Sequence, residues 1–279
     1  MRHLFARLAS LGAILLVPAL GPAPAAAQDA AMVRLETADD SRGWDAVGKL
    51  VLGKRGFCTG SLIGPQLVLT AAHCLYDKKT GVQLRPEEIE FMAGFRNGRA
   101  VAYRRVSRAI AHPGYRYSAA DKLDRVTDDL ALLELSQPIR LPSLVPFETG
   151  AAPVEGDAVD VVSYAQYREE APSIQEACQV LADSRDALIL TCNVDFGSSG
   201  APVFSVRDGV ARVVSVISAK AEVDGRKVAL AVPLAEPLAA LMEALDSSRA
   251  GSGARSGAGS GGVKILSGGN GNGAKFVKP

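Results

Sequence analysis

The stretch Asp195–Pro202 reads Asp-Phe-Gly-Ser-Ser-Gly-Ala-Pro, and it decides how the rest of this chain is interpreted. A serine set between glycines and followed by a small residue and proline is typical of a hydroxyl presented as a nucleophile. A Gly-Ser-Ser-Gly string alone is more often a flexible turn, so the interpretation depends on the remaining sequence. Ser199 is the first catalytic candidate, and it needs a base and an acid from elsewhere.

Two upstream segments supply these groups. Leu69–Cys74 contains His73, one of three histidines, and a neutral imidazole can accept the proton of an attacking serine. Asp128–Leu133 places Asp129 directly before an apolar run, and a buried carboxylate at the second ring nitrogen would fix the tautomer and stabilise the imidazolium. The sequence therefore predicts a triad of base, orienting acid and nucleophile.

In the chain order His, Asp, Ser, these segments resemble trypsin-like serine proteases, in particular the bacterial trypsin-like and glutamyl endopeptidase branch. The resemblance covers most of residues 44–245 and is strongest through Trp44–Gly48 and Phe57–Ile63. It implies an all-β fold of two six-stranded antiparallel β-barrels with a C-terminal helix, with the site in the cleft between the barrels. It also implies an oxyanion hole formed by the main-chain N–H groups of Gly197 and Ser199.

Ser198 departs from the digestive proteases, which carry aspartate just before the nucleophile. In those enzymes the aspartate pairs with a newly cut amino terminus and thereby forms the oxyanion hole. Ser198 cannot make that ion pair, so this activation switch does not carry over. The function that the resemblance implies is a serine endopeptidase that works through an acyl-enzyme. The alternative is a catalytically silent binding module on the same fold, because fold alone does not establish activity.

The resemblance also suggests where the primary specificity pocket lies. Asn193 stands six residues before the nucleophile, at the position that lines the pocket floor, with Val194 beside it and Ser218 on the facing strand. No carboxylate occupies this floor position, so a strong preference for Arg or Lys is not expected. The facing strand Val213–Ser218 lacks the histidine of glutamyl endopeptidases. Lys220 is either a partner for an acidic substrate side chain or a solvated surface lysine.

Two further residues are set aside as non-catalytic. Asp128 is expected to cap a turn or to face solvent. His112 precedes Pro113, which imposes an extended turn geometry, and it is expected to be a surface residue with no acidic partner.

The four cysteines are an even set, which is typical of proteins from oxidising compartments, and they allow three pairings. The family resemblance implies Cys58 with Cys74, which would clamp the segment carrying His73, and Cys178 with Cys192. Each bridge would close a loop of about 15 residues and contribute roughly 3 kcal/mol in the chain-entropy model. Paired Cys-x-x-Cys spacing is absent, so we expect no zinc, and no other metal or cofactor is expected.

The amino-terminal residues 1–27 predict a secretory signal peptide. Basic residues precede the apolar run Leu8–Leu20, and Ala25–Ala27 form a small-residue cleavage site before Gln28. The run contains Pro18 and is shorter than the ~20 residues that span a bilayer, so a retained anchor is disfavoured. We expect a secreted or periplasmic protein without stable membrane insertion.

The remaining chain divides into three parts. Residues 28–43 are a possible propeptide or amino-terminal arm, and residues 44–245 are the protease-like domain, with barrels at about 44–140 and 150–232. A helix is expected at about 234–246, where leucines recur at helical spacing. Residues 246–279, rich in glycine and serine, are expected to form a flexible tail.

Short apolar and β-branched runs bounded by turn residues predict strands. They are Val51–Leu52, Leu67–Thr70, Val101–Val106, Leu130–Leu135, Val159–Ser163, Leu188–Cys192, Val213–Ser218 and Val228–Val232. The proline-rich stretch Pro138–Pro153 is the expected connection between barrels. The 31 basic and 30 acidic residues give a formal net charge of +1 with no basic stripe, so we expect no nucleic-acid partner. The resemblance implies a protein or peptide substrate, and we expect a monomer.

Overall fold

The first barrel closes six antiparallel strands in the order β2-β3-β4-β7-β6-β5. We use a computed structural model, which describes residues 31–117, 126–183, 187–223 and 225–257. The strand bounds are β2 Val47–Leu52, β3 Phe57–Gly64, β4 Leu67–Thr70, β5 Ile89–Ala93, β6 Ala102–Ala111 and β7 Ala131–Leu135. Alternate side chains of β5, namely Ile89, Phe91 and Ala93, point into the barrel and are fully buried, as the two-residue period of a half-buried strand requires.

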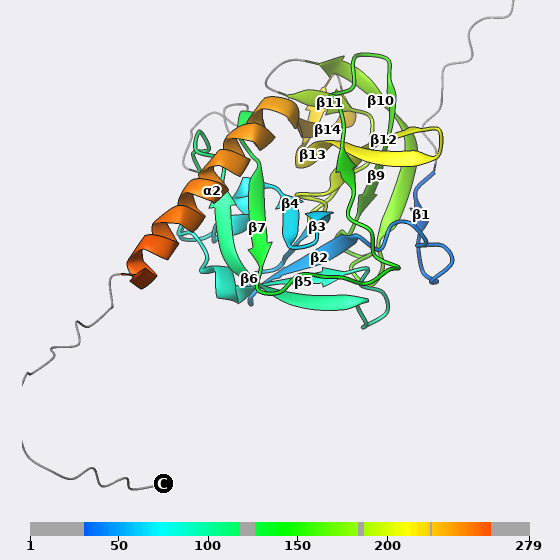
Figure 1. Cartoon of the computed structure of the whole chain (residues 1–279). Coiled ribbons are helices and arrows are strands. Elements are labelled where there is room, and N and C mark those ends of the chain that lie inside the picture. The colour runs from blue at the N-terminus through cyan, green and yellow to red at the C-terminus, as the bar shows by residue number, and fades with distance from the viewer. Residues whose placement is uncertain (1–30, 118–125, 184–186, 224, 258–279) are drawn as a thin grey trace, which may run out of the picture.

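The second barrel closes because β9 pairs with both β10 and β12. Its strands are β9 Ala158–Ser163, β10 Ser173–Asp183, β11 Leu188–Leu190, β12 Pro202–Arg207, β13 Val210–Val223 and β14 Arg226–Pro233. Two short strands extend it: β1 (Val33–Arg34) pairs with β10, and β8 (Glu148–Thr149) runs parallel to β13. The expected fold of two six-stranded antiparallel barrels is confirmed, and Figure 1 shows the barrels stacked one on the other.

Each run predicted to be a strand overlaps a strand of the structure, but no run was predicted for the barrel strands β3, β5, β10 and β12. In β10 the register shifts between Gln175 and Cys178, and Ala177 adopts a positive φ of 55°. The prediction depended on continuous apolar and β-branched runs, and the polar residues Gln175, Glu176 and Gln179 interrupt such a run around the bulge. The connection between the barrels runs from the end of β7 to the start of β9 and contains only β8, as the prolines of this stretch indicated.

The described part of the amino-terminal arm packs on the second barrel. Beyond the β1 pairing, the Leu35 N–H donates to the Pro172 carbonyl at 2.9 Å, and Leu35 is buried. The predicted signal peptide, residues 1–27, lies outside the described residues. Within the described ranges, no helix is both long enough and apolar enough to cross a membrane.

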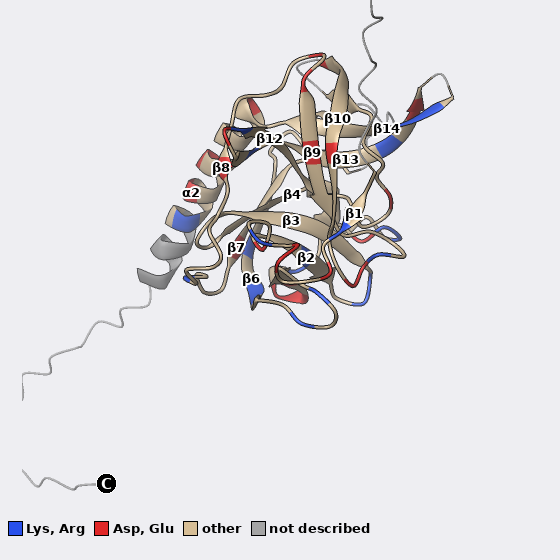
Figure 2. Cartoon of the chain, turned by 90° about the vertical axis from the view of Figure 1, so that its right-hand side faces the viewer, with Lys and Arg blue, Asp and Glu red and all other residues tan. Residues whose placement is uncertain are grey.

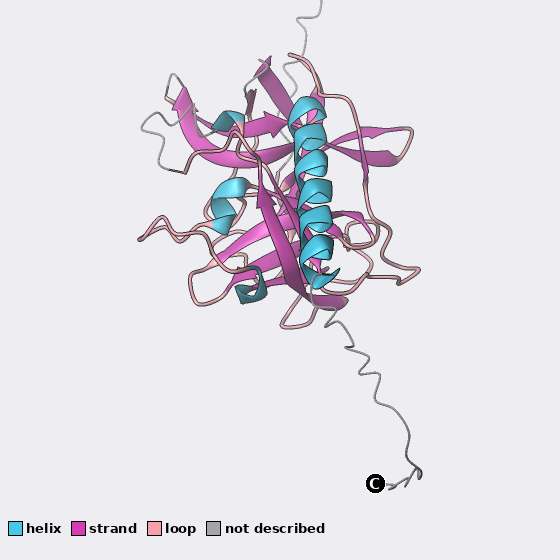
Figure 3. Ribbon diagram, turned by 60° about the vertical axis from the view of Figure 1, so that its left-hand side comes forward, coloured by secondary structure: helices cyan, strands magenta, loops and turns pink. Residues whose placement is uncertain are grey.

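The carboxy-terminal helix α2 (Ala235–Gly257) continues well past the expected end near residue 246. It crosses from the second barrel onto the outside of β6 and β7 in the first (Figures 1 and 3). Arg108 donates to the carbonyl and hydroxyl of Ser248 at 2.9 and 2.7 Å, and Arg249 pairs with Glu134 at 2.7 Å. These contacts hold the helix beyond residue 246, where the change in composition predicted the start of a flexible tail. Residues 258–279 of the predicted tail lie outside the described residues.

Acidic and basic residues are interspersed along the ribbon in Figure 2. This agrees with the balanced composition of the chain.

Two truncations test the docking of α2. Deleting residues 251–279 keeps both contacts and should leave the melting temperature nearly unchanged. Deleting residues 247–279 removes both contacts and should lower the free energy of unfolding by about 1–3 kcal/mol, the range for hydrogen bonds to charged groups. The measurement is chemical denaturation of both variants beside the full chain. Equal stability of the two truncated proteins would contradict the docking contacts.

Candidate active site

His73 is held by Asp129 at two points. The main-chain N–H of His73 donates to Asp129 Oδ1, and Nδ1 of its ring lies beside Oδ2, both at 2.7 Å. His73 sits on the short 3-10 helix η1 (Ala72–Leu75), which directly follows β4, and Asp129 directly precedes the β7 region. Because Nδ1 is engaged by the carboxylate, Nε2 is the ring nitrogen left to accept a proton.

Asp129 also receives a hydrogen bond from the second barrel. Ser218 Oγ, on β13, donates to Asp129 Oδ2 at 2.5 Å. The Asp129 side chain is only 3% exposed, so three donors converge on a carboxylate that has lost its water. Buried charge is tolerated only where such donors compensate its desolvation. Sequence reasoning placed Ser218 in the specificity pocket and missed this contact.

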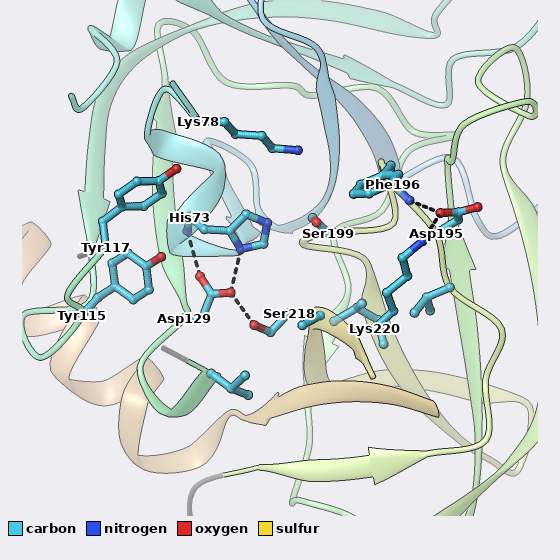
Figure 4. Close-up of a pocket in the computed structure, with 14 residues that line it drawn as sticks. His73, Lys78, Tyr115, Tyr117, Asp129, Asp195, Phe196, Ser199, Ser218 and Lys220 are labelled. Carbon is cyan, nitrogen blue, oxygen red and sulfur yellow. Dashed lines mark hydrogen bonds and ion pairs between the residues drawn. The ribbon is translucent and has the colours of Figure 1, made fainter. Parts of the chain in front are cut away.

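Ser199 shares one cavity of about 490 Å³ with His73, Asp129 and Ser218. Figure 4 shows Ser199 beside the His73 ring, with Asp129 on the other side of the ring. Among the described residues, Ser199 Oγ makes no hydrogen bond to Nε2. Such bonds are often long in unliganded sites and tighten when substrate binds.

Two peptide groups beside Ser199 are oriented so that their N–H groups are free. The Phe196 carbonyl accepts from the Gln166 N–H at 2.7 Å, and the Ser198 carbonyl accepts from the Ala201 N–H at 2.9 Å. In a planar trans peptide the N–H points opposite to the C=O. The next N–H groups in the chain, those of Gly197 and Ser199, therefore point away from these partners. Neither donates a hydrogen bond within the described chain, so both are available to an oxyanion.

The first barrel clamps the loop that carries the nucleophile, which we call the nucleophile loop (residues 195–200). Thr59 on β3 donates from its N–H to the Ser199 carbonyl and from its hydroxyl to the Gly197 carbonyl, both at 2.8 Å. Gly200 has a φ of 78°, and a Cβ atom there would lie 2.1 Å from Thr70 Oγ1 and 2.3 Å from the Thr59 carbonyl. The close approach of two barrels therefore explains this glycine. No sequence motif pointed to Thr59.

The tentative pocket residues divide into two groups. Val194, Ser218 and Lys220 line the cavity, whereas Asn193 is exposed and donates its N–H to Gln175 Oε1 at 2.7 Å. Asn193 is therefore not part of this cavity, because its backbone is bonded toward β10.

Lys220 is engaged within the protein. Its Nζ lies 2.8 Å from Asp195 Oδ1 and 4.3 Å from the centre of the Phe196 ring. The Lys220 hydrogen bond lowers the pKa of the Asp195 carboxyl, so this carboxyl is ionised at neutral pH. The sequence left open whether Lys220 meets substrate or solvent, and the structure gives it an internal partner (Figure 4).

The opposite wall of the cavity was not predicted from the sequence. It is formed by Lys78, Tyr115 and Tyr117, and Lys78 Nζ lies 5.4 Å from the Phe196 ring centre. Tyr117 stacks on Tyr76 with ring centres 4.9 Å apart. These residues come from loops of the first barrel, where no motif marks them.

His112 has an acidic partner, contrary to the expectation from its sequence context. Its Nδ1 lies 3.0 Å from Asp128 Oδ1, and the His112 side chain is only 13% exposed. Asp128 therefore neither caps a turn nor simply faces solvent. The pair forms because Asp128 and the Pro113 turn lie side by side, which the linear sequence does not show.

Both disulfides form with the pairing that the resemblance implied, Cys58–Cys74 and Cys178–Cys192. Cys58, His73 and Cys74 gather within 4.8 Å of one another, the only such group among the described residues. A cysteine binds zinc as a thiolate, and the sulfurs of Cys58 and Cys74 are bonded to each other. The disulfide therefore fixes the segment that carries His73, and His73 is the one residue of the three that could still bind a metal.

Comparison with known proteins gives consistent matches. A family model described as Trypsin matches residues 36–236. Kallikrein 1-related peptidase b3 of Mus musculus is 38% identical over 93 residues, 32% of this chain and 33% of that protein. Tryptase of Mus musculus is 36% identical over 94 residues, 32% of this chain and 29% of that protein. The aligned segment thus spans about a third of the length of these relatives.

The fold has a close counterpart among solved structures. A Glu endopeptidase in complex with MPD superposes with a TM-score of 0.62 at 16% identity, covering 80% of this chain and 98% of that one. At this identity the likeness concerns the fold.

A matched pair of glycine substitutions tests the packing of the nucleophile loop. Gly200 and Gly209 have nearly equal φ angles, 78° and 75°, but only Gly200 has neighbours within reach of a Cβ atom. Gly209→Ala should cost about 1 kcal/mol from backbone strain. Gly200→Ala should cost at least about 2 kcal/mol more, because the clash involves backbone atoms. Urea denaturation measures both, and equal losses would contradict the close contact.

Proposed function

The chain belongs to the trypsin family of serine proteases, and from this premise we propose that it is an exported serine endopeptidase with His73, Asp129 and Ser199 as its triad. The observation that carries the proposal is that Asp129 binds both the main-chain N–H and the ring Nδ1 of His73, in the cavity that Ser199 also lines. A histidine fixed in ring and main chain presents one nitrogen in one orientation, which a general base requires.

Each catalytic step uses a group already described. Ser199 Oγ attacks the carbonyl carbon of the scissile peptide while His73 Nε2 takes its proton. The carbonyl oxygen becomes an oxyanion and accepts the N–H groups of Gly197 and Ser199. His73 then protonates the leaving nitrogen, the C–N bond breaks, and an ester to Ser199 remains. Water attacks this ester with His73 again as base, which releases a carboxylate product and restores the serine.

The alternative is a binding module that keeps the fold and lacks activity. Three features support the enzyme over this alternative: the buried carboxylate with three donors, the free N–H groups, and a nucleophile that faces a cavity. A binding module needs none of them.

The substrates we propose are proteins or peptides. Among the lining residues that the structure describes, the carboxylates are Asp129 and Asp195, and both are engaged by partners of this chain. A strong preference for Arg or Lys side chains is therefore not expected. We propose that the chain acts as a monomer outside the cytoplasm, which the two disulfides and the signal-like residues 1–27 support.

Substitution of the nucleophile tests the activity. A fluorophosphonate probe should label the protein covalently, and Ser199→Ala should abolish both labelling and hydrolysis of a casein-derived peptide mixture. Turnover should fall by roughly 10⁴-fold or more, because triad members act as a unit. Circular dichroism of the variant checks that it is folded. Undiminished hydrolysis by folded Ser199→Ala protein would refute the assignment, and an unlabelled parent protein would favour the binding module.

A second pair of variants tests the choice of acid. Asp129→Asn should lower the turnover number by about 10⁴-fold, since an amide favours the wrong imidazole tautomer. Asp128→Asn should change it by less than about 5-fold, because Asp128 meets His112 and not His73. Rates at a single neutral pH suffice. Comparable losses in the two proteins would mean that the acid has been misassigned.

A further inference from the structure

Arg168 is a partly buried arginine that contacts the residue directly before the nucleophile. Its guanidinium donates to the Ser163 carbonyl at 2.8 Å, to Ser163 Oγ at 3.1 Å and to Ser198 Oγ at 3.3 Å. Ser163 ends β9, a strand of the second barrel, and Ser198 is fully buried. One planar side chain therefore joins the barrel wall to the nucleophile loop.

We propose that Arg168 is a positioning residue that holds the nucleophile loop in its active arrangement, so that the oxyanion hole forms without an ion pair to a newly cut amino terminus. The inference rests on the proposed function. It concerns a residue that acts through Ser198 and does not touch the substrate.

The turn that carries Arg168 also contacts the other peptide of the oxyanion hole. The Arg168 N–H closes a turn by donating to the Ala165 carbonyl at 2.9 Å, and Gln166 in this turn donates to the Phe196 carbonyl. Gln166 thereby orients the Gly197 N–H, while Arg168 secures Ser198. A single four-residue turn contacts both sides of the loop that must present two N–H groups.

The turn adopts a strained conformation. Tyr167 has a φ of 68°, in the left-handed region that bulky residues avoid, and its side chain is 86% exposed. Since the ring gains little packing there, nothing about Tyr167 itself favours this conformation. Such backbone strain persists only where surrounding contacts impose it, and strained residues gather near active centres. Here the surrounding contacts are those of Arg168 and Gln166.

The first barrel anchors the far side of the turn. Lys49 Nζ donates to the Glu169 carbonyl at 3.1 Å, and the Asn97 N–H donates to the Glu170 carbonyl at 2.6 Å. Lys49 also lies over the rings of Phe57 and Phe95, at 4.7 and 4.9 Å from their centres. The turn is therefore fixed at both ends.

The charged groups near Arg168 allow its guanidinium to remain positively charged although it is partly buried. Burial lowers the pKa of the guanidinium to about 10, and the negative charge of Asp195 opposes this shift. Arg168 therefore remains charged at neutral pH. Arg34 is the other charge that acts on it, and Arg34 has its own partner in Glu36 at 3.2 Å. The Ser198 hydroxyl is neutral, so it would not attract the ammonium group of a newly cut amino terminus. Arg168 already donates a hydrogen bond to this hydroxyl.

The test compares Arg168→Met, which keeps most of the side-chain volume, with Arg212→Met, which removes an arginine paired to Glu148 away from the cavity. Fluorophosphonate labelling rates, kcat and KM on one peptide, and affinity for a peptide aldehyde are measured. The aldehyde forms a hemiacetal whose oxygen needs the oxyanion hole. Arg168→Met should lower kcat and the labelling rate by about 100-fold and weaken aldehyde binding similarly, with KM changed less than about 3-fold. Arg212→Met should match the parent protein.

A purely structural role predicts a different result: a lower melting temperature, with kcat per folded molecule unchanged. That result would overturn the proposal. If Arg168→Met does not fold, Arg168→Lys and Ser198→Ala decide, because each removes fewer contacts. A loss of at least about 5-fold in kcat for both, with intact circular dichroism, supports positioning, and parental kcat in either contradicts it. Failure of the parent protein to react with the probe would instead refute the proposed function.

Discussion

The buried carboxylate of Asp129 is the constraint on which the site depends. A charge removed from water costs several kcal/mol unless donors replace its hydration. Here the donors come from two sources, the His73 main chain and ring in the first barrel and the Ser218 hydroxyl in the second. The carboxylate is satisfied only when the barrels meet in one relative position. The same contact that orients the imidazole therefore also fixes the interface between the two halves of the molecule.

The nucleophile loop, like Asp129, is held by hydrogen bonds from both barrels. Its Gly197 and Ser199 carbonyls accept from Thr59 of the first barrel, and its buried Ser198 hydroxyl accepts from Arg168 of the second. The Phe196 and Ser198 carbonyls are bonded to N–H groups of the second barrel, so the N–H groups that follow them in the chain point the other way. The hydrogen bonds of these two carbonyl groups are therefore sufficient to orient the N–H groups of the proposed oxyanion hole.

The local sequence was sufficient to predict the short motifs and most of the strands. The segments around His73, Asp129 and Ser199 are short motifs, and the predicted strands followed from apolar and β-branched runs bounded by turn residues. Thr59 and Arg168 could not be found in this way, because their partners lie 138 and 30 residues away in the chain. A single threonine or arginine in a sequence does not indicate which distant residue it will contact.

The errors have the same origin. His112 was interpreted from its neighbours in sequence, whereas its partner Asp128 comes from another segment. The end of α2 was misjudged because composition favoured a flexible chain from residue 246 onward, while Arg108 and Glu134 of the first barrel hold Ser248 and Arg249 of the helix. In each case a tertiary contact overrode a local tendency.

The position of Ser218 has a consequence for the order of folding. This residue follows the nucleophile in the chain, and α2, which comes later still, returns to pack on β6 and β7. During synthesis the first barrel emerges before either of these groups exists. Asp129 then lacks one donor, and one face of the barrel lacks its cover. His73, Asp129 and Ser199 therefore reach their described arrangement only after nearly the whole described chain has been synthesised, so the proposed activity requires that both barrels have formed.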